Sequence, residues 1–133
     1  MIFEKTKVIL DTNFLLVPGE LGIDIFSEIE RLLDERHKLI VFENTLEELE
    51  TLIHRSNSKE SINAKLGFVM AKQKNLKTIK GFSGHVDDII VEYTKNNPSN
   101  FIVATQDKKL KSRLKRNNVR VIGVRQKKYL VLG

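Results

Sequence analysis

The stretch VILDTNFLL, from Val8 to Leu16, interrupts a run of aliphatic side chains with three polar residues. A buried strand of a parallel sheet is almost continuously hydrophobic, as Val8, Ile9 and Leu10 are. Asp11 follows at once, and a carboxylate is costly inside a protein unless it is paired or holds a metal ion. Either a plain turn begins there, or the acid ends the strand for chemical reasons. We favour the second interpretation, because Asp11 precedes no evident helix that it would cap.

The rest of the chain alternates between short apolar runs and helical patterns. Apolar runs at residues 39–42, 101–104, 119–124 and 129–132 predict four further strands. Helical patterns cover residues 23–33, a segment opened by Asn44, a segment from Ser58 to about Lys74 that carries Ile62, Leu66, Val69 and Met70, residues 85–97, and the region of Leu110 and Leu114. Strands separated by helices predict an α/β fold with a parallel sheet covered on both faces. No linker or repeat is evident, so residues 1–133 are expected to form one domain.

Two further assignments follow from the local sequence. His37 and Lys38 are expected near the end of the first helix, where cations suit the helix dipole. Residues 75–84 form the most irregular stretch and are expected to be a loop.

Composition narrows the class of protein. Hydrophobic residues make up 41% of the chain and charged residues 30%, as in soluble globular proteins. Cysteine is absent, which excludes disulfides and thiolate zinc sites. No apolar run approaches the roughly 20 residues that span a bilayer, and the opening MIFEKTK is unlike a signal peptide. We therefore expect a cytoplasmic protein with no membrane contact.

The positive charge is concentrated near the C-terminus. The net charge is +6, and residues 108–133 hold ten Lys or Arg and no acid. A basic zone of this kind is typical of a polyanion-binding surface. A solvated helix face with a basic strand edge explains the same pattern, and charge alone does not separate the two.

Acidic residues follow several of the predicted strands. Asp11 ends the first strand, and Asp107 lies three residues after Ala104. Further acids open the helices after other segments: Glu47, Glu48, Glu50, Asp87 and Asp88. Ligands of open α/β sheets bind at the carboxyl ends of the strands, so these acids are expected at one edge. Gathered carboxylates repel one another, and oxygen ligands without Cys or paired His favour Mg²⁺ or Mn²⁺ over zinc. For each acid alone, a favourable contact with a helix dipole is the competing explanation.

The acids after the second strand can be ranked by helical geometry. Asn44 and Glu47 have the spacing of a capping box. At 100° per residue Glu47 points roughly 145° away from the apolar stripe of its helix and should be solvated. Glu48 and Glu50 flank the stripe and can reach inward.

Four segments, VILDTNFLL, TLEELETL, HVDDIIVEY and IVATQDKKLKSRL, resemble in order the four acidic motifs of the PIN domain, a metal-dependent ribonuclease fold. The resemblance covers nearly the whole chain and implies a three-layer α/β/α sandwich with a central parallel sheet. It places the catalytic and metal-binding acids at Asp11, Glu48, Asp87 and Asp107. Asn13 and Thr105 match supporting polar positions, and Asp88 is either an additional ligand or a bystander.

The activity implied by the resemblance is Mg²⁺- or Mn²⁺-dependent hydrolysis of RNA phosphodiesters that leaves a 5′-phosphate. Single-stranded or looped RNA is the expected substrate, held by Lys108, Lys109, Lys111 and Arg113. Within the family, the sequence most resembles the PIN nucleases of small-subunit rRNA processing and their archaeal relatives, which implies a role in rRNA processing or ribosome assembly. A VapC-type toxin and a non-catalytic RNA-binding subunit remain alternatives. A second copy of the chain, an antitoxin and a ribosome-assembly protein are the partners left open.

Overall fold

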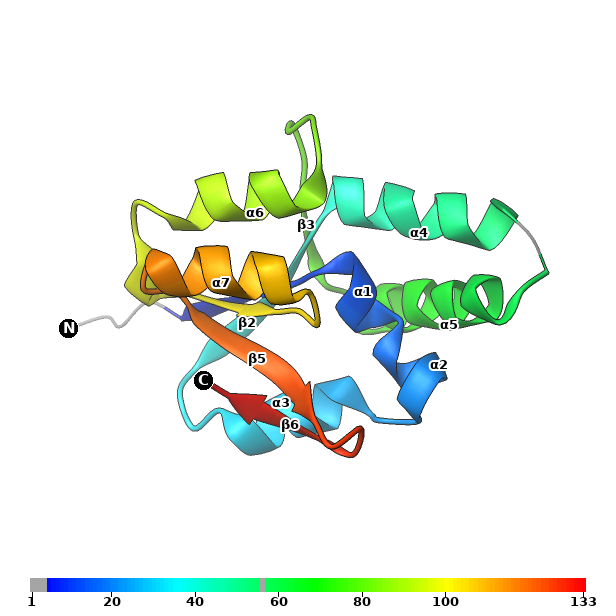
Figure 1. The fold of residues 1–133 in the computed structure, drawn as a ribbon, viewed down its shortest axis with the longest axis horizontal. Helices are drawn as coiled ribbons and strands as arrows, with labels where there is room; N and C mark the ends of the chain where they lie inside the picture. Colours follow the sequence, from blue (N-terminus) through cyan, green and yellow to red (C-terminus); the bar gives the residue numbers. More distant parts are fainter. Residues whose placement is uncertain (1–4, 56) are drawn as a thin grey trace.

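A six-stranded sheet organises the residues that the computed structural model describes, 5–55 and 57–133 (Figure 1). The order is β3-β2-β1-β4-β5-β6; the first five strands are parallel, and β6 is antiparallel to β5. The strands are β1 (Thr6–Leu10), β2 (His37–Phe42), β3 (Lys77–Ile79), β4 (Phe101–Ala104), β5 (Arg120–Arg125) and β6 (Tyr129–Leu132). The sheet is therefore mixed, with β1 at its centre.

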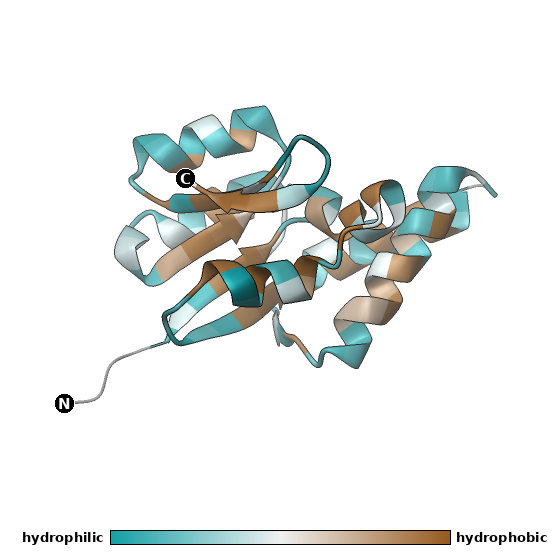
Figure 2. Cartoon of the chain, turned by 90° about the horizontal axis from the view of Figure 1, so that it is seen from below, coloured by the Kyte–Doolittle hydropathy of each residue, from teal (hydrophilic) through white to brown (hydrophobic). Residues whose placement is uncertain are grey.

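Helices cover both faces of the sheet, which confirms the expected three-layer α/β architecture. They are α1 (Thr12–Leu15), α2 (Val17–Leu21), α3 (Ile25–Leu32), α4 (Glu43–Arg55), α5 (Lys59–Gln73), α6 (Val86–Thr94), the short 3₁₀ helix η1 (Pro98–Asn100) and α7 (Lys108–Arg116). Helices α1 to α5 pack in one hydrophobic cluster and α6 and α7 in a second. Figure 2 shows the hydrophobic strands between helices that carry both hydrophilic and hydrophobic residues.

The central strand explains why two cores form. Side chains alternate along a strand, so Val8 and Leu10 enter the first cluster and Ile9 enters the second. All three are fully buried. Ile9 pairs in register with Ile40 of β2 and Val103 of β4, which lie on the same face. The continuous apolar run after Lys7 is thus the signature of a strand covered on both sides.

Several elements differ from the sequence-based expectations. Residues 12–21 form α1 and α2, which are too short to show a helical period. The expected loop at 75–84 contains β3, an edge strand of three residues. His37 and Lys38 begin β2 and do not end a helix, because α3 stops at Leu32 and the chain turns back to the sheet. Among the described helices, none combines the length and hydrophobicity that a bilayer crossing needs.

Helix α5 does not bury the face that its hydrophobic pattern indicates. Ser58 caps it as expected, its hydroxyl oxygen accepting from the Ser61 backbone N–H at 3.3 Å. Its apolar residues Ile62, Leu66 and Val69 are, however, exposed. Small residues face inward instead, at Ser61, Ala64, Gly67 and Ala71. The reason is close packing: a Cβ atom on Gly67 would lie 2.1 Å from the Leu15 carbonyl oxygen of α1.

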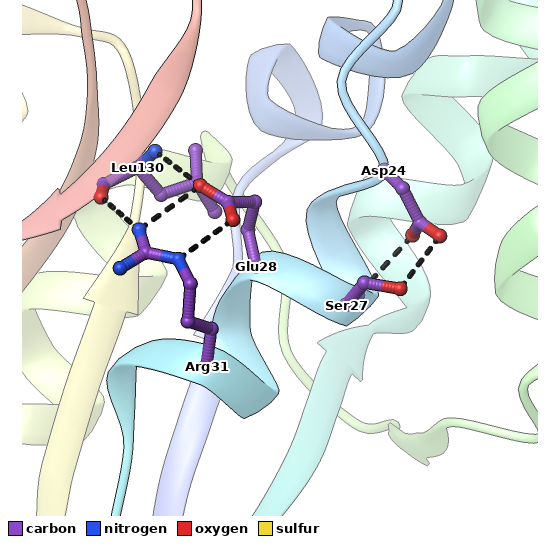
Figure 3. A network of polar contacts seen from close by, with 5 residues as sticks. All are labelled: Asp24, Ser27, Glu28, Arg31 and Leu130. Carbon is purple, nitrogen blue, oxygen red and sulfur yellow. Dashed lines mark hydrogen bonds and ion pairs between the residues drawn. The ribbon is translucent and has the colours of Figure 1, made fainter.

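Helix α3 holds the antiparallel strand β6 through a polar network (Figure 3). Glu28 accepts from the Leu130 backbone N–H at 3.0 Å, and Arg31 donates to the Leu130 carbonyl at 3.2 Å. Asp24 caps the same helix by accepting from the Ser27 backbone N–H at 3.2 Å and its hydroxyl at 2.7 Å. Strand β6 thus keeps its backbone bonded on the side that no other strand covers.

Candidate active site

A cavity of about 470 Å³ opens at the carboxyl edge of the sheet, where β1 meets α1. Its lining is Asp11, Thr12, Asn13, Leu16, Glu48, Thr51, Leu52, Arg55, His85, Val86, Asp87 and Asp107. The four acids singled out from the motifs come from four separate segments and all lie on this one surface. Parallel strands end at the same edge, and this topology brings the segments together.

Asp11 is the most buried of the four acids, with 6% of its surface exposed. Its Oδ2 accepts from the Thr105 hydroxyl at 2.7 Å, and its Oδ1 accepts from the Thr12 backbone N–H at 2.9 Å. The second contact makes Asp11 the N-cap of α1, so the expectation that it caps no helix was wrong. Helix α1 has only four residues, and no sequence pattern marks it.

The pKa of Asp11 is raised from 3.8 to about 6. Burial is the largest cause, because it removes water from the ionised form, and the negative charges of Glu48 and Asp107 add to it. The hydrogen bonds from Thr105 and Thr12 oppose the rise. The ionised form of Asp11 is therefore disfavoured by its burial and by the acids around it.

Asn13 and Thr105 connect the tips of the two central strands. The Asn13 Oδ1 accepts from the Gln106 backbone N–H at 3.0 Å. The Thr105 hydroxyl oxygen accepts from the Asp107 backbone N–H at 3.0 Å while its proton goes to Asp11. These polar residues therefore fix the segment that carries Asp107 against the segment that carries Asp11.

Of the acids on α4, Glu48 lines the cavity and its carboxylate accepts from the Thr12 hydroxyl. All three glutamates are exposed, but Glu47 and Glu50 lie outside the lining, so the expectation that Glu50 reaches inward was wrong. The expected capping box is wrong, because α4 begins at Glu43, directly after β2. Asn44 lies inside the helix, and its side-chain amide donates to the Phe82 carbonyl at 2.9 Å.

The other acids have structural partners as well. Asp107 caps α7, its Oδ1 accepting from the backbone N–H groups of Lys109 at 2.8 Å and Leu110 at 3.2 Å. Asp87 lines the cavity at the start of α6, and Asp88 does not. Arg113 of α7 approaches both, with its Nη1 2.9 Å from the Asp88 Oδ1 and 3.7 Å from the Asp87 Oδ2. Asp88 is therefore held in an ion pair at the edge of the site.

The donor chemistry of the cavity fits Mg²⁺ or Mn²⁺. Within residues 5–55 and 57–133, no three acidic or His side chains converge tightly enough to hold an ion between them. Mg²⁺ does not need such a cage, since it keeps several waters and binds one or two carboxylates together with substrate phosphates. Asp11 and its neighbours Glu48 and Asp107 supply that kind of oxygen ligand, with charge still to be neutralised.

The basic residues expected to bind RNA lie beside the cavity rather than in it. Lys108, Lys109 and Arg113 line a separate groove of about 410 Å³ on α7, together with Ser112 and Arg116. Lys111 is outside the lining of that groove. Among the described residues that line the acidic cavity, Arg55 and His85 are the basic side chains. Neither residue is among those expected at the site from the sequence, although Arg55 lies seven positions from Glu48 and so on the same helix face.

A mostly parallel α/β sheet with a buried aspartate at its central strand tip, and three more acids around it, is the arrangement that the resemblance to PIN nucleases implies. The match of residues 8–127 to the PIN like domain family establishes that the chain belongs to this family. It is 38% identical to Ribonuclease VapC4 of Methanocaldococcus jannaschii over 92% of this chain and 93% of that protein.

The fold is shared with solved structures. The PIN domain endonuclease Utp24 superposes with a TM-score of 0.77 at 23% identity, covering 95% of this chain and 90% of that one. A domain of a functionally unknown protein from Methanocaldococcus jannaschii superposes with a TM-score of 0.57 at 20% identity, covering 90% and 91%. At these identities the likeness concerns the fold alone, and it agrees with the expected PIN architecture.

Proposed function

We propose that this protein is an endoribonuclease that hydrolyses RNA phosphodiesters with the help of Mg²⁺ or Mn²⁺. The observation that carries the proposal is the meeting of Asp11, Glu48, Asp87 and Asp107, from four segments, on one cavity of a PIN-family chain. The name of the 38% identical relative, a ribonuclease, supports RNA as the substrate.

In the proposed reaction a water oxygen attacks phosphorus, the P–O3′ bond breaks, and the products carry a 5′-phosphate and a 3′-hydroxyl. A divalent cation, when bound in the cavity, would supply Lewis-acid charge at the phosphate and lower the pKa of a water. Asp11, Glu48, Asp87 and Asp107 are the residues proposed to hold it. Thr105 and Thr12 each bind one oxygen of Asp11 and so fix the orientation of its carboxylate.

Asp107 and Glu48 are also held in place by their neighbours. Helix α7 fixes the Oδ1 of Asp107 through two backbone N–H groups, and among the described residues no hydrogen bond reaches its Oδ2. The Thr12 hydroxyl orients Glu48. These contacts preorganise carboxylate oxygens at the cavity before any ligand enters, which reduces the cost of ordering them during the reaction.

Two cellular roles are compatible with this chemistry. The ribonuclease relative of VapC type, at nearly equal length, favours a toxin that pairs with an antitoxin. Processing of rRNA in ribosome assembly rests on the motif resemblance and on the shared fold with Utp24. A cytoplasmic location suits either role. The non-catalytic alternative is less well supported, because all four acids are present in the cavity.

The test is cleavage of a labelled single-stranded RNA by purified protein in Mg²⁺, in Mn²⁺ and in EDTA, with two matched variants. Glu48→Gln should lower turnover by orders of magnitude, because it removes a cation ligand from the cavity. Glu47→Gln, one residue away and outside the cavity, should cleave nearly as well as the unmodified protein. Full cleavage in EDTA would refute the metal-dependent mechanism. An inactive Glu47→Gln beside an active Glu48→Gln would overturn the assignment of the α4 ligand.

A further inference from the structure

An arginine in the wall of the acidic cavity has no role in the reaction as described above. Arg55 ends α4, and it lines the cavity together with Glu48, Thr51 and Leu52 of the same helix. The spacings of three, four and seven residues place all four side chains on one face of α4. The helix that presents an acid to the cavity therefore also presents a guanidinium two turns away.

The two arginines near the acids differ in their partners. Arg113 of α7 is paired with Asp88 at 2.9 Å and lies 3.7 Å from Asp87, so part of its charge is already neutralised. Arg55 is exposed, and within residues 5–55 and 57–133 no carboxylate lies at ion-pair distance from it. Its five N–H donors are accordingly available to a ligand in the cavity.

The sheet topology places Arg55 across the site from the basic helix. Helix α4 follows β2 and α7 follows β4, and these two strands flank β1 on opposite sides. Asp11 at the tip of β1 lies between them. In Figure 1, α7 and the far end of α4 lie on opposite sides of α1. A polynucleotide bound to the α7 groove and passing Asp11 therefore continues toward Arg55.

Such a strand needs positive charge on both sides of the acids. Four carboxylates repel the phosphate backbone, and within residues 5–55 and 57–133 the lining residues able to carry positive charge are Arg55 and His85. A guanidinium binds a phosphate through two parallel N–H bonds, which fixes geometry as well as adding affinity. A flexible single strand can follow this path because its backbone bends where a duplex does not.

We propose that Arg55 binds a backbone phosphate of the RNA on the α4 side of the scissile bond, while Lys108 and Lys109 bind the backbone on the α7 side. This inference rests on the proposed ribonuclease function. Arg55 is a substrate-positioning residue in this arrangement: it holds the strand across the cavity so that the scissile phosphate meets the acids.

The experiment measures binding and cleavage separately for Arg55→Gln, Arg55→Lys and the control Arg36→Gln. Arg36 is an exposed arginine just before β2, at the opposite edge of the sheet from the cavity. Binding of a fluorescent single-stranded RNA is followed by anisotropy in EDTA, where metal-dependent cleavage is stopped. Steady-state cleavage in Mg²⁺ then gives KM and kcat.

Arg55→Gln is expected to weaken RNA binding by about tenfold or more and to raise KM by a similar factor, since it removes a charge-assisted contact. Arg55→Lys should restore part of the affinity through its charge alone. Arg36→Gln should behave like the unmodified protein. The proposal is overturned if Arg55→Gln binds RNA as tightly as the unmodified protein, or if Arg36→Gln weakens binding equally.

The binding measurement separates this inference from the proposed function. A protein that cleaves no RNA in any divalent cation, yet loses affinity on Arg55→Gln, would refute the nuclease and keep the Arg55 contact. A protein that cleaves with full dependence on Glu48 but not on Arg55 would refute the contact and keep the nuclease. Failure to bind single-stranded RNA at all would overturn the Arg55 proposal.

Discussion

Asp11 combines two properties that usually oppose each other, burial and charge. The carboxylate is enclosed by the strand tips, and its pKa rises to about 6 because burial and neighbouring acids disfavour the ionised form. Two hydrogen bonds hold it in place without neutralising it. Sites of this kind lower the folding stability of a protein, because they hold a charged group in an environment that disfavours its charge. That an acid would lie at this strand tip could be predicted from the break after Leu10. Its cap role could not, because α1 is too short to leave a pattern.

The cost of burying Asp11 should appear as a pH-dependent stability difference between the unmodified protein and Asp11→Asn in EDTA. The pKa is raised in the folded state, so folding takes up a proton between pH 3.8 and about 6. Ionisation of Asp11 therefore does not lower the free energy of unfolding below pH 3.8. It lowers this free energy increasingly between pH 3.8 and about 6, and by the full amount above about pH 6. Two pKa units correspond to about 3 kcal/mol. Urea unfolding at pH 4 and pH 8 measures the difference.

The free energy of unfolding of Asp11→Asn, minus that of the unmodified protein, should thus be larger at pH 8 than at pH 4. The increase should be up to about 3 kcal/mol. Taking the difference between the two proteins cancels the titration of every other group that the substitution leaves unchanged. The same stability difference at both pH values would show that Asp11 is ionised at little cost, and the physical account of the site would be wrong.

At the scale of elements, the sequence was informative wherever burial and periodicity coincide. The strands at 101–104 and 129–132 are found where their apolar runs predicted them, and Ser58 caps α5 as expected. The inward face of α5 was not predictable in this way. Hydrophobicity predicted that Ile62, Leu66 and Val69 would face the core. The structure instead buries Ala64 and Gly67, because the backbones of the two helices approach closely there. Close packing of two helices requires small residues at the contact, and a hydrophobicity scale does not register that requirement.

Gly67→Ala should therefore destabilise the protein far more than truncation of an apolar neighbour on the outer face. The added Cβ would lie 2.1 Å from the Leu15 carbonyl oxygen and 2.9 Å from its carbonyl carbon, so α5 must move away from α1. Overpacking of this kind costs about 1–3 kcal/mol or more, against a gain of up to about 1 kcal/mol from replacing glycine within a helix. Leu66→Ala, at a side chain that is 42% exposed, is the matched control and should cost less. Thermal melts of both variants decide it; a Gly67→Ala protein as stable as Leu66→Ala would contradict the packing.

At the scale of the whole molecule, the fold places an acidic cavity beside the basic helix α7. The four acids were found from motifs in sequence order, and the parallel topology explains why they meet. The positions of the cations were predicted less well, because a run of basic residues does not show which side chains face a groove and which pair with acids. Lys108 and Lys109 line the α7 groove, Lys111 does not, and Arg113 is tied to Asp88.

The basic helix should determine how strongly RNA binding depends on salt. Each phosphate contact to a single strand contributes about 0.7 to the slope of log K against log salt, because binding releases counterions. Lys108→Ala combined with Lys109→Ala should therefore reduce the slope by about 1.4, if both lysines contact phosphates. Arg113→Ala should change the slope less, since its guanidinium is already paired with Asp88.

The control removes two exposed lysines from α5, Lys65 and Lys72, and alters net charge equally. Anisotropy titrations at several salt concentrations give the slopes. Equal slopes for the α7 and α5 double variants would show that RNA responds to net charge and not to the α7 groove.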